Sequence, residues 1–193
     1  MFGYIKTMGR SKKVSDAELM DRLLVVIGRD GPDLSFAQAA KYADLAPATL
    51  VQRFGTREGM VESTLLHAWA RLEEATHAAH TEATTDPAGA VDLLLRLTNS
   101  GSGEVDFSEG LLLLREDFRN PVLRARGAAW EKQLTAALGQ RLSQDPTLAA
   151  VLGRQLISIW QGAIIWWGFT RQGTLHENVK VVLNDWRRIA LRS

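Results

Sequence analysis

Residues 45–54 read LAPATLVQRF, and this short stretch decides how the rest of the chain is interpreted. Pro47 suits the first position of a helix, where its missing N–H removes no hydrogen bond. Leu50 and Phe54 lie four residues apart and therefore share one helix face. Gly55 follows and favours a helix end. Because so short a helix is marginal in water, the pattern predicts that it packs on neighbouring segments.

Two other short helices are predicted before this stretch. Residues 15–18 (SDAE) have the spacing of a capping box and predict a helix to about residue 29, which the Asp-Gly-Pro at 30–32 ends. Residues 35–38 (SFAQ) are a second capping box and predict a helix to about residue 42. Residues 44–46 then form a tight turn. The small side chains at 39–40 allow the second and third helices to cross closely.

A tight turn between two short helices is typical of a helix-turn-helix. With Leu50 and Phe54 facing inward, the third helix presents an outer face of small and polar residues: Pro47, Ala48, Thr49, Gln52 and Arg53. Small residues at its start allow close approach to a DNA major groove, and the polar ones supply contacts. On periodicity alone, an ordinary three-helix bundle with a solvated face fits equally well.

The rest of the chain also shows helical punctuation. Thr56 can cap a long helix over 57–83, and three pairs place an Asx cap before proline at the first helical position: Asp86-Pro87, Asn120-Pro121 and Asp145-Pro146. They predict helices near 86–99, 106–118, 121–143 and 146–171, before a last helix near 175–191. Alternating strand patterns and hairpin turns are missing, so the sequence predicts an all-α fold.

Composition excludes several kinds of site. The 193 residues include no cysteine, so disulfides, thiol catalysis and zinc–thiolate sites are excluded. Net charge is only +1, but residues 1–13 carry four basic side chains and no acid. Such an arm can meet a polyanion, although a solvated terminus explains it as well. No signal peptide or bilayer-spanning run is recognised, and the expected compartment is the cytoplasm.

Residues 35–61, SFAQAAKYADLAPATLVQRFGTREGMV, resemble the DNA-binding motif of the TetR family of bacterial transcriptional regulators. The matching positions are Ser35, Ala40, Leu45, Thr49, Leu50, Phe54, Arg57, Glu58 and Met60. The chain departs from the family pattern at Asp44, Ala46, Ala48 and Val51, where the family has Gly, Ser, Gly and a phosphate-contacting Tyr. Asp44 must therefore accept the turn with a Cβ, in a left-handed conformation that Asp tolerates.

The resemblance implies a DNA-binding domain over residues 1–56 and an effector-binding and dimerisation domain over 57–193. A homodimer would place two reading helices in successive major grooves of a palindromic operator, about 34–36 Å apart. Phosphate contacts are expected from Lys12, Lys13, Ser35, Thr49, Arg53 and Arg57, and base contacts from Pro47, Ala48 and Gln52. With so few polar readers, DNA shape is expected to contribute to specificity.

The same resemblance implies that the last two helices form the dimer interface, which the all-round apolar segment 146–171 favours. Interface residues are expected at Gly162, Gly168, Val179, Val182, Leu183 and Trp186. A small apolar or aromatic effector would release the DNA and would bind among Trp69, Leu93, Leu97, Leu113, Trp130, Trp160, Ile164 and Trp167. Repression is the commoner outcome in the family, and neither a cofactor nor enzyme activity is expected.

Two alternatives stay open. His77 and His80 lie three residues apart on one helix face, a turn after Glu73 and Glu74, and such spacing can bind a metal in a helical enzyme. The second alternative is a helical interaction module whose helix-turn-helix has lost its DNA role, which the departures at Asp44 and Val51 permit.

Overall fold

The computed structural model of the protein describes residues 14–100 and 107–191, and every regular element in these ranges is a helix. The helices are α1 (Asp16–Asp30), α2 (Phe36–Ala43), α3 (Pro47–Phe54), α4 (Arg57–Glu82), α5 (Pro87–Ser100), α6 (Phe107–Arg119), α7 (Pro121–Leu142), α8 (Pro146–Thr170) and α9 (Leu175–Ala190). The predicted all-α fold is confirmed, and the predicted helix ends agree to within one residue.

Several helix starts agree with the sequence because a side chain there caps the helix. The Ser15 hydroxyl accepts a hydrogen bond from the Glu18 N–H, and Ser35 forms a complete capping box with Gln38. Asn120 and Asp145 each accept from two backbone N–H groups of the turn that follows. These side chains satisfy N–H groups that a helix start would otherwise leave without partners.

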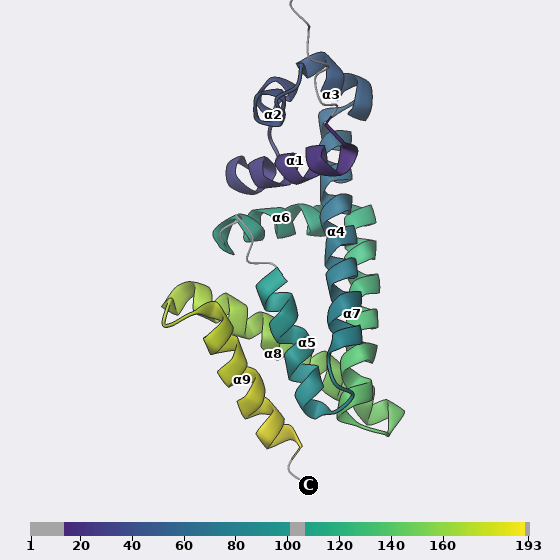
Figure 1. Cartoon of the computed structure of the whole chain (residues 1–193), viewed down its shortest axis with the longest axis vertical. Coiled ribbons are helices and arrows are strands. Elements are labelled where there is room, and N and C mark those ends of the chain that lie inside the picture. Colours follow the sequence, from purple (N-terminus) through teal and green to yellow (C-terminus); the bar gives the residue numbers. More distant parts are fainter. Residues whose placement is uncertain (1–13, 101–106, 192–193) are drawn as a thin grey trace, which may run out of the picture.

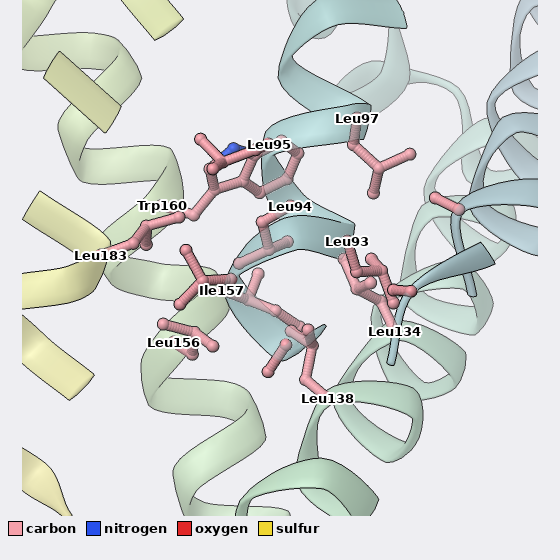
Figure 2. Close-up of a cluster of buried hydrophobic side chains, with 14 of the residues drawn as sticks. Leu93, Leu94, Leu95, Leu97, Leu134, Leu138, Leu156, Ile157, Trp160 and Leu183 are labelled. Atoms are coloured by element: carbon pink, nitrogen blue, oxygen red, sulfur yellow. The ribbon is translucent and has the colours of Figure 1, made fainter. Parts of the chain in front are cut away.

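Two hydrophobic clusters organise the fold. The first joins α1, α2, α3 and the beginning of α4 around fully buried Leu19, Leu23 and Leu50. The second joins the end of α4 to α5, α7, α8 and α9, and Figure 2 shows Leu93, Leu156 and Leu183 within it. Figure 1 places α1–α3 at one end of the long axis and α5, α8 and α9 toward the other.

Helix α4 belongs to both clusters. Its first turns contribute Met60 and Leu65 to the N-terminal cluster, and Ala79 near its other end lies in the second cluster. It runs along the long axis beside α7 (Figure 1). Trp69, near its middle, packs against both clusters. A tilt of α4 would therefore move the three-helix head relative to the helical body.

The far end of α4 is fastened by Arg141 of α7, whose side chain is almost fully buried. Its guanidinium donates to the carbonyl oxygens of His80 and Thr84 at 2.8 Å and of Ala137 at 2.7 Å. A cation at the carbonyl end of a helix complements the helix dipole. Because the site is buried, desolvation lowers the pKa of Arg141.

Helix α8 corrects one prediction. The sequence reading expected no segment able to span a bilayer, yet within the described residues α8 is long and apolar enough to do so by length and composition. A single such helix is weak support for a membrane protein, because core helices of soluble proteins also pass this test. The buried side of α8, including Leu156 and Trp160, packs in the second cluster.

Candidate functional site

Small side chains let α2 and α3 pack closely in the helix-turn-helix. Ala39 and Ala40 are buried at the crossing, and Leu50 anchors α3 with no exposed surface. Asp44 adopts φ 55° and ψ 47°, the left-handed conformation predicted for this turn. The Leu45 N–H donates to the Ala40 carbonyl at 3.0 Å and closes the turn. The outer face of α3 is thereby fixed in orientation.

That outer face is open to solvent. Pro47, Ala48 and Gln52 are exposed, and Thr49 is half-buried. Val51, which stands where the TetR pattern has tyrosine, is 46% exposed. The surface combines small side chains at the helix start with an amide beyond them, which suits entry into a major groove.

The predicted phosphate-binding side chains already have protein partners. Arg53 pairs with Asp16 of α1 at 2.8 Å, and Arg57 lies 3.2 Å from Glu58 and 3.7 Å from Asp33. The Ser35 hydroxyl donates to Gln38 at 2.7 Å. Since exposed ion pairs contribute little stability, a phosphate can take over either arginine at small cost. Lys12 and Lys13, also predicted to bind phosphate, precede the described residues.

The tryptophans predicted to line an effector pocket instead form a packed row. The ring centroids of Trp69 and Trp130 are 5.9 Å apart, and those of Trp130 and Trp160 are 6.5 Å apart. Trp130 donates its indole N–H to Thr76, and Trp160 donates to Thr98, each at 2.9 Å. These indoles have satisfied polar groups and little exposed surface, so they serve as core.

The remaining predicted pocket residues also lie in packed surroundings. Leu93 and Leu97 are buried, Leu113 and Ile164 pack against the clusters, and Trp167 donates to the Gly173 carbonyl at 3.3 Å where α8 ends. Neither of the two clefts described below is lined by any of the eight residues. These residues are packed in this structure, and their role in effector binding stays a prediction.

The head and body meet at the α6–α7 corner. Trp69 donates to the Asp117 carboxylate of α6 at 2.9 Å, and Asn120 donates to Glu62 of α4 at 2.6 Å. Desolvation raises the pKa of Asp117, while the Trp69 hydrogen bond lowers it. A cleft of about 390 Å³ lies here between the α1–α2 loop, α4 and this corner. The corner therefore holds α4 at two points.

Helix α1 is also tied to α4. His67 and Arg71 of α4 both bond the Asp21 carboxylate of α1, at 2.9 and 2.6 Å. Although desolvation raises the pKa of Asp21, the hydrogen bonds and charges of its two partners outweigh it and lower the pKa overall. These two contacts fasten α1 to the first half of α4.

The predicted dimer face requires a correction. Val179 and Leu183 have no exposed surface, because α9 uses its apolar stripe to cover the chain's own core, and Val182 and Trp186 pack against that core. The large apolar residues that α8 and α9 leave exposed are Leu148, Val151, Ile165, Trp166, Phe169, Val181 and Ile189. A Cβ added at Gly162 would meet nothing within 4 Å, so this position is open to a partner. Gly168 is half-buried.

The side chains of the metal-site alternative have other partners. Glu73 forms a bidentate ion pair with Arg126 of α7, with bonds of 2.7 and 2.8 Å. The His80 ring bonds Arg141 at 3.0 Å. Desolvation, and then the charge of Arg141, lower the pKa of His80. These contacts join α4 to α7. Among the described residues, no group of three or more His, Asp or Glu side chains is placed to hold a metal ion.

Three solved structures show the same architecture. A protein from Saccharomonospora viridis described as a transcriptional regulator, in complex with choline, matches with 17% identity and TM-score 0.70 over 88% of this chain and 93% of its own. The multidrug binding protein EbrR, complexed with imidazole, matches with 23% identity and TM-score 0.58 over 86% of each chain. PfmR, a TetR family transcriptional regulator from Thermus thermophilus, matches with 18% identity and TM-score 0.66 over 91% of this chain and 99% of its own.

These likenesses show the fold: the chain folds like these three proteins, two of which are described as transcriptional regulators. The fold is that of PfmR, a TetR family protein, as the residues of the helix-turn-helix predicted. No protein-family model and no curated protein matches the sequence.

Proposed function

We propose that the protein is a cytoplasmic transcriptional repressor that binds a palindromic DNA operator as a homodimer and is released by a small effector. The observation that carries this proposal is the exposed outer face of α3, set on buried Leu50 within a TetR fold. Residues 1–56 would bind DNA, and residues 57–193 would dimerise and bind the effector. Neither a cofactor nor a catalytic step is part of this function.

At the DNA, contacts divide by role. Gln52 is placed for a base edge and can pair with adenine through its amide, while Pro47 and Ala48 suit contact with a thymine methyl group. Arg53 and Arg57 would exchange their carboxylate partners for phosphates, joined by Ser35, Thr49 and the basic arm with Lys12 and Lys13. The exposed carboxylate of Asp16 would then lie close to DNA and oppose binding.

Dimerisation would use the exposed apolar surface of α8 and α9. Trp166 and Phe169 are 68% and 77% exposed, and their rings lie 5.7 Å apart. An apolar surface of this kind on a soluble chain is typical of a protein interface. Gly162 would allow a partner helix to approach closely. Two α8–α9 pairs would then form a four-helix interface.

Effector release would act through α4. An effector shifts the equilibrium only if it binds the DNA-incompetent arrangement more tightly. Because α4 spans both hydrophobic clusters and is held by Asp117 and Asn120 at the α6–α7 corner, rearrangement of the body changes the spacing of the two heads. Choline and imidazole in the similar structures support a small-molecule effector for this chain, which we propose is apolar or aromatic in its main part.

Selection of bound duplexes from random DNA tests the function directly. We expect a palindromic consensus with half-sites one helical turn apart. Gln52→Ala should relax the preference at one base pair of each half-site, which corresponds to roughly 1–3 kcal/mol of discrimination. Gln133→Ala, an exposed glutamine on α7, is the matched control and should leave the consensus unchanged. Failure to enrich any duplex would favour the interaction-module alternative.

A further inference from the structure

A cleft of about 330 Å³ lies between α5 and α9, at the opposite end of the long axis from helices α1–α3 (Figure 1). Figure 1 shows these two helices side by side at the far end of the body. The volume is at the lower end of the range for small-molecule sites. Its polar lining comprises Asp92, Arg96, Asn99, His176, Lys180, Asn184 and Arg187.

The α9 wall of this cleft consists of nitrogen-bearing side chains. His176, Lys180, Asn184 and Arg187 follow at intervals of four, four and three residues, so they share one helix face. That stripe lies beside the buried stripe of Val179 and Leu183 rather than on the exposed apolar face. The Asn184 amide donates to the Lys180 carbonyl and the His176 ring bonds Asn99. The α9 wall therefore offers mainly the positive charges of Lys180 and Arg187.

Two of the basic side chains that line the cleft, Lys180 and Arg187, have no carboxylate partner within residues 14–100 and 107–191. Among the described residues that line the cleft, Asp92 is the only carboxylate. It pairs with Arg96 at 2.8 Å, and Arg96 also pairs with Glu82. Lys180 and Arg187 form no ion pair with any carboxylate in the part of the chain that the structure describes. Two unpaired cations two turns apart on one wall attract an anion.

The opposite wall supplies an apolar floor. Val91 and Leu95 of α5 line the cleft and are 4% and 9% exposed, and Ala88 precedes them by one turn. Their neighbours Leu93 and Leu94 lie in the core shown in Figure 2, so the floor is fixed. At one end, His176 and Asn99 join the two helices with a 2.9 Å hydrogen bond.

We propose that this cleft binds a small organic anion, a carboxylate or phosphate group carried on a short apolar body. The anionic group lies between Lys180 and Arg187, and the apolar body lies on Val91 and Leu95. Arg187 can hold either group with two parallel hydrogen bonds, and Lys180 adds a point charge. A neutral ligand of the same shape gains only the apolar contact.

Occupancy would connect two helices that the proposed function uses. α9 carries part of the proposed dimer face, and Thr98 of α5 accepts the indole N–H of Trp160 from α8. An anion that bridges α5 and α9 therefore sets the position of α9 against α8. This consequence, unlike binding itself, rests on the proposed function.

Calorimetric titration of the full chain without DNA, at low ionic strength, tests the site. Benzoate and phenyl phosphate are the anionic probes, and benzamide is the neutral probe of matched shape. We expect at least one anion to bind at least tenfold more tightly than benzamide and to weaken as salt is added. Equal affinity of the anions and benzamide, or no anion binding at millimolar concentration, would overturn the proposal.

Variants place the binding in this cleft. Lys180→Gln with Arg187→Gln should weaken binding of the anion at least tenfold, while Lys180→Arg should retain it. Lys132→Gln, at an exposed lysine of α7, is the matched control and should bind like the wild type. Unchanged affinity in the double variant would refute the site. Since DNA is absent from all these titrations, their outcome is separate from that of the operator selection.

Discussion

Two exposed surfaces of this protein, the outer faces of α3 and α8, differ in chemistry. The outer face of α3 presents Pro47, Ala48 and Gln52 beside Arg53, which is paired with a solvated carboxylate. The outer face of α8 presents Trp166 and Phe169, both more than two-thirds exposed. Each surface is left uncovered by the chain's own fold, but only the second is costly to leave in water.

This difference indicates two kinds of partner. An aromatic side chain buries roughly 150–250 Å², and each Å² of apolar surface removed from water contributes about 25 cal/mol, so the α8 face favours a permanent apolar contact. The α3 face offers little apolar area. Its affinity must come from charge and shape, and it is therefore expected to depend on salt.

The largest effect is expected from placing charge on the α8 face. Trp166→Glu combined with Phe169→Glu should weaken self-association by at least about a hundredfold, since aromatic residues central to an interface contribute about 2 kcal/mol or more each. Sedimentation analysis should show a monomer. DNA affinity should fall together with self-association, because a monomer contacts only one half-site.

Phe118→Glu is the matched control for that experiment. Phe118 of α6 is 65% exposed, close to the 68% of Trp166, but lies outside the proposed interface. It should leave the dimer intact. If the double variant remains dimeric, or if Phe118→Glu dissociates the dimer as strongly, the assignment of the α8 face is wrong.

A smaller effect is expected from a substitution on the α3 face. Arg53→Ala should weaken binding to all duplexes about tenfold and lower the slope of log affinity against log salt by about one, because one phosphate contact is lost. Electrophoretic or fluorescence titration at several salt concentrations measures both. An unchanged salt slope would show that Arg53 stays with Asp16 in the complex.

Much of the fold was predictable because its signals are local. The Ser15 side-chain cap, the Ser35 capping box and the Asx-Pro pairs act within four residues, so these helix starts follow from the sequence. The left-handed Asp44 was predictable for the same reason, since the turn geometry and the tolerance of Asp for it are both local.

The surfaces were less predictable because they depend on long-range packing. Helical spacing placed Val179 and Leu183 on one apolar face, but it did not reveal whether the chain itself or a twin covers that face. For the tryptophans, helical spacing likewise did not reveal whether they pack in the core or line a pocket. The Arg53–Asp16 pair joins residues that are 37 apart in the sequence. The α5–α9 cleft joins segments that are further apart still. No local sequence pattern therefore predicts either feature.

Breaking the Arg53–Asp16 pair is expected to raise the DNA affinity of the α3 face. Asp16→Asn removes the carboxylate that competes with phosphate for Arg53 and also removes its repulsion of DNA. We expect affinity to rise about threefold at low salt, and less at high salt because exposed charges are screened. Asp185→Asn, at an exposed pair with Arg188 on α9, is the control and should leave DNA affinity unchanged. Weaker DNA binding by Asp16→Asn would contradict the competition.

The smallest effect is expected where the two regions meet, at Asp117. Burial holds the pKa of its carboxyl above the ordinary value of 3.8, so the folded state binds its proton more tightly than the unfolded chain does. Stability from this group is therefore complete below pH 3.8 and is lost as pH rises through the folded pKa. Asp117→Asn keeps an oxygen to accept from Trp69 and carries no charge. It should therefore be more stable than wild type at pH 7 by roughly 0.5 kcal/mol, allowing for partial exposure, with little difference at about pH 3.5.

Asp86 provides a control of opposite sign for the same measurement, denaturant unfolding at the two pH values. Hydrogen bonds from the Thr84 hydroxyl and the Gly89 N–H lower the pKa of the Asp86 carboxyl. Its contribution is therefore present above pH 3.8 and lost as pH falls through the folded pKa. Asp86→Asn should thus be less stable than wild type at pH 7, whereas Asp117→Asn should be more stable. Loss of stability in Asp117→Asn, as in Asp86→Asn, would mean that desolvation does not penalise the Asp117 charge at the junction.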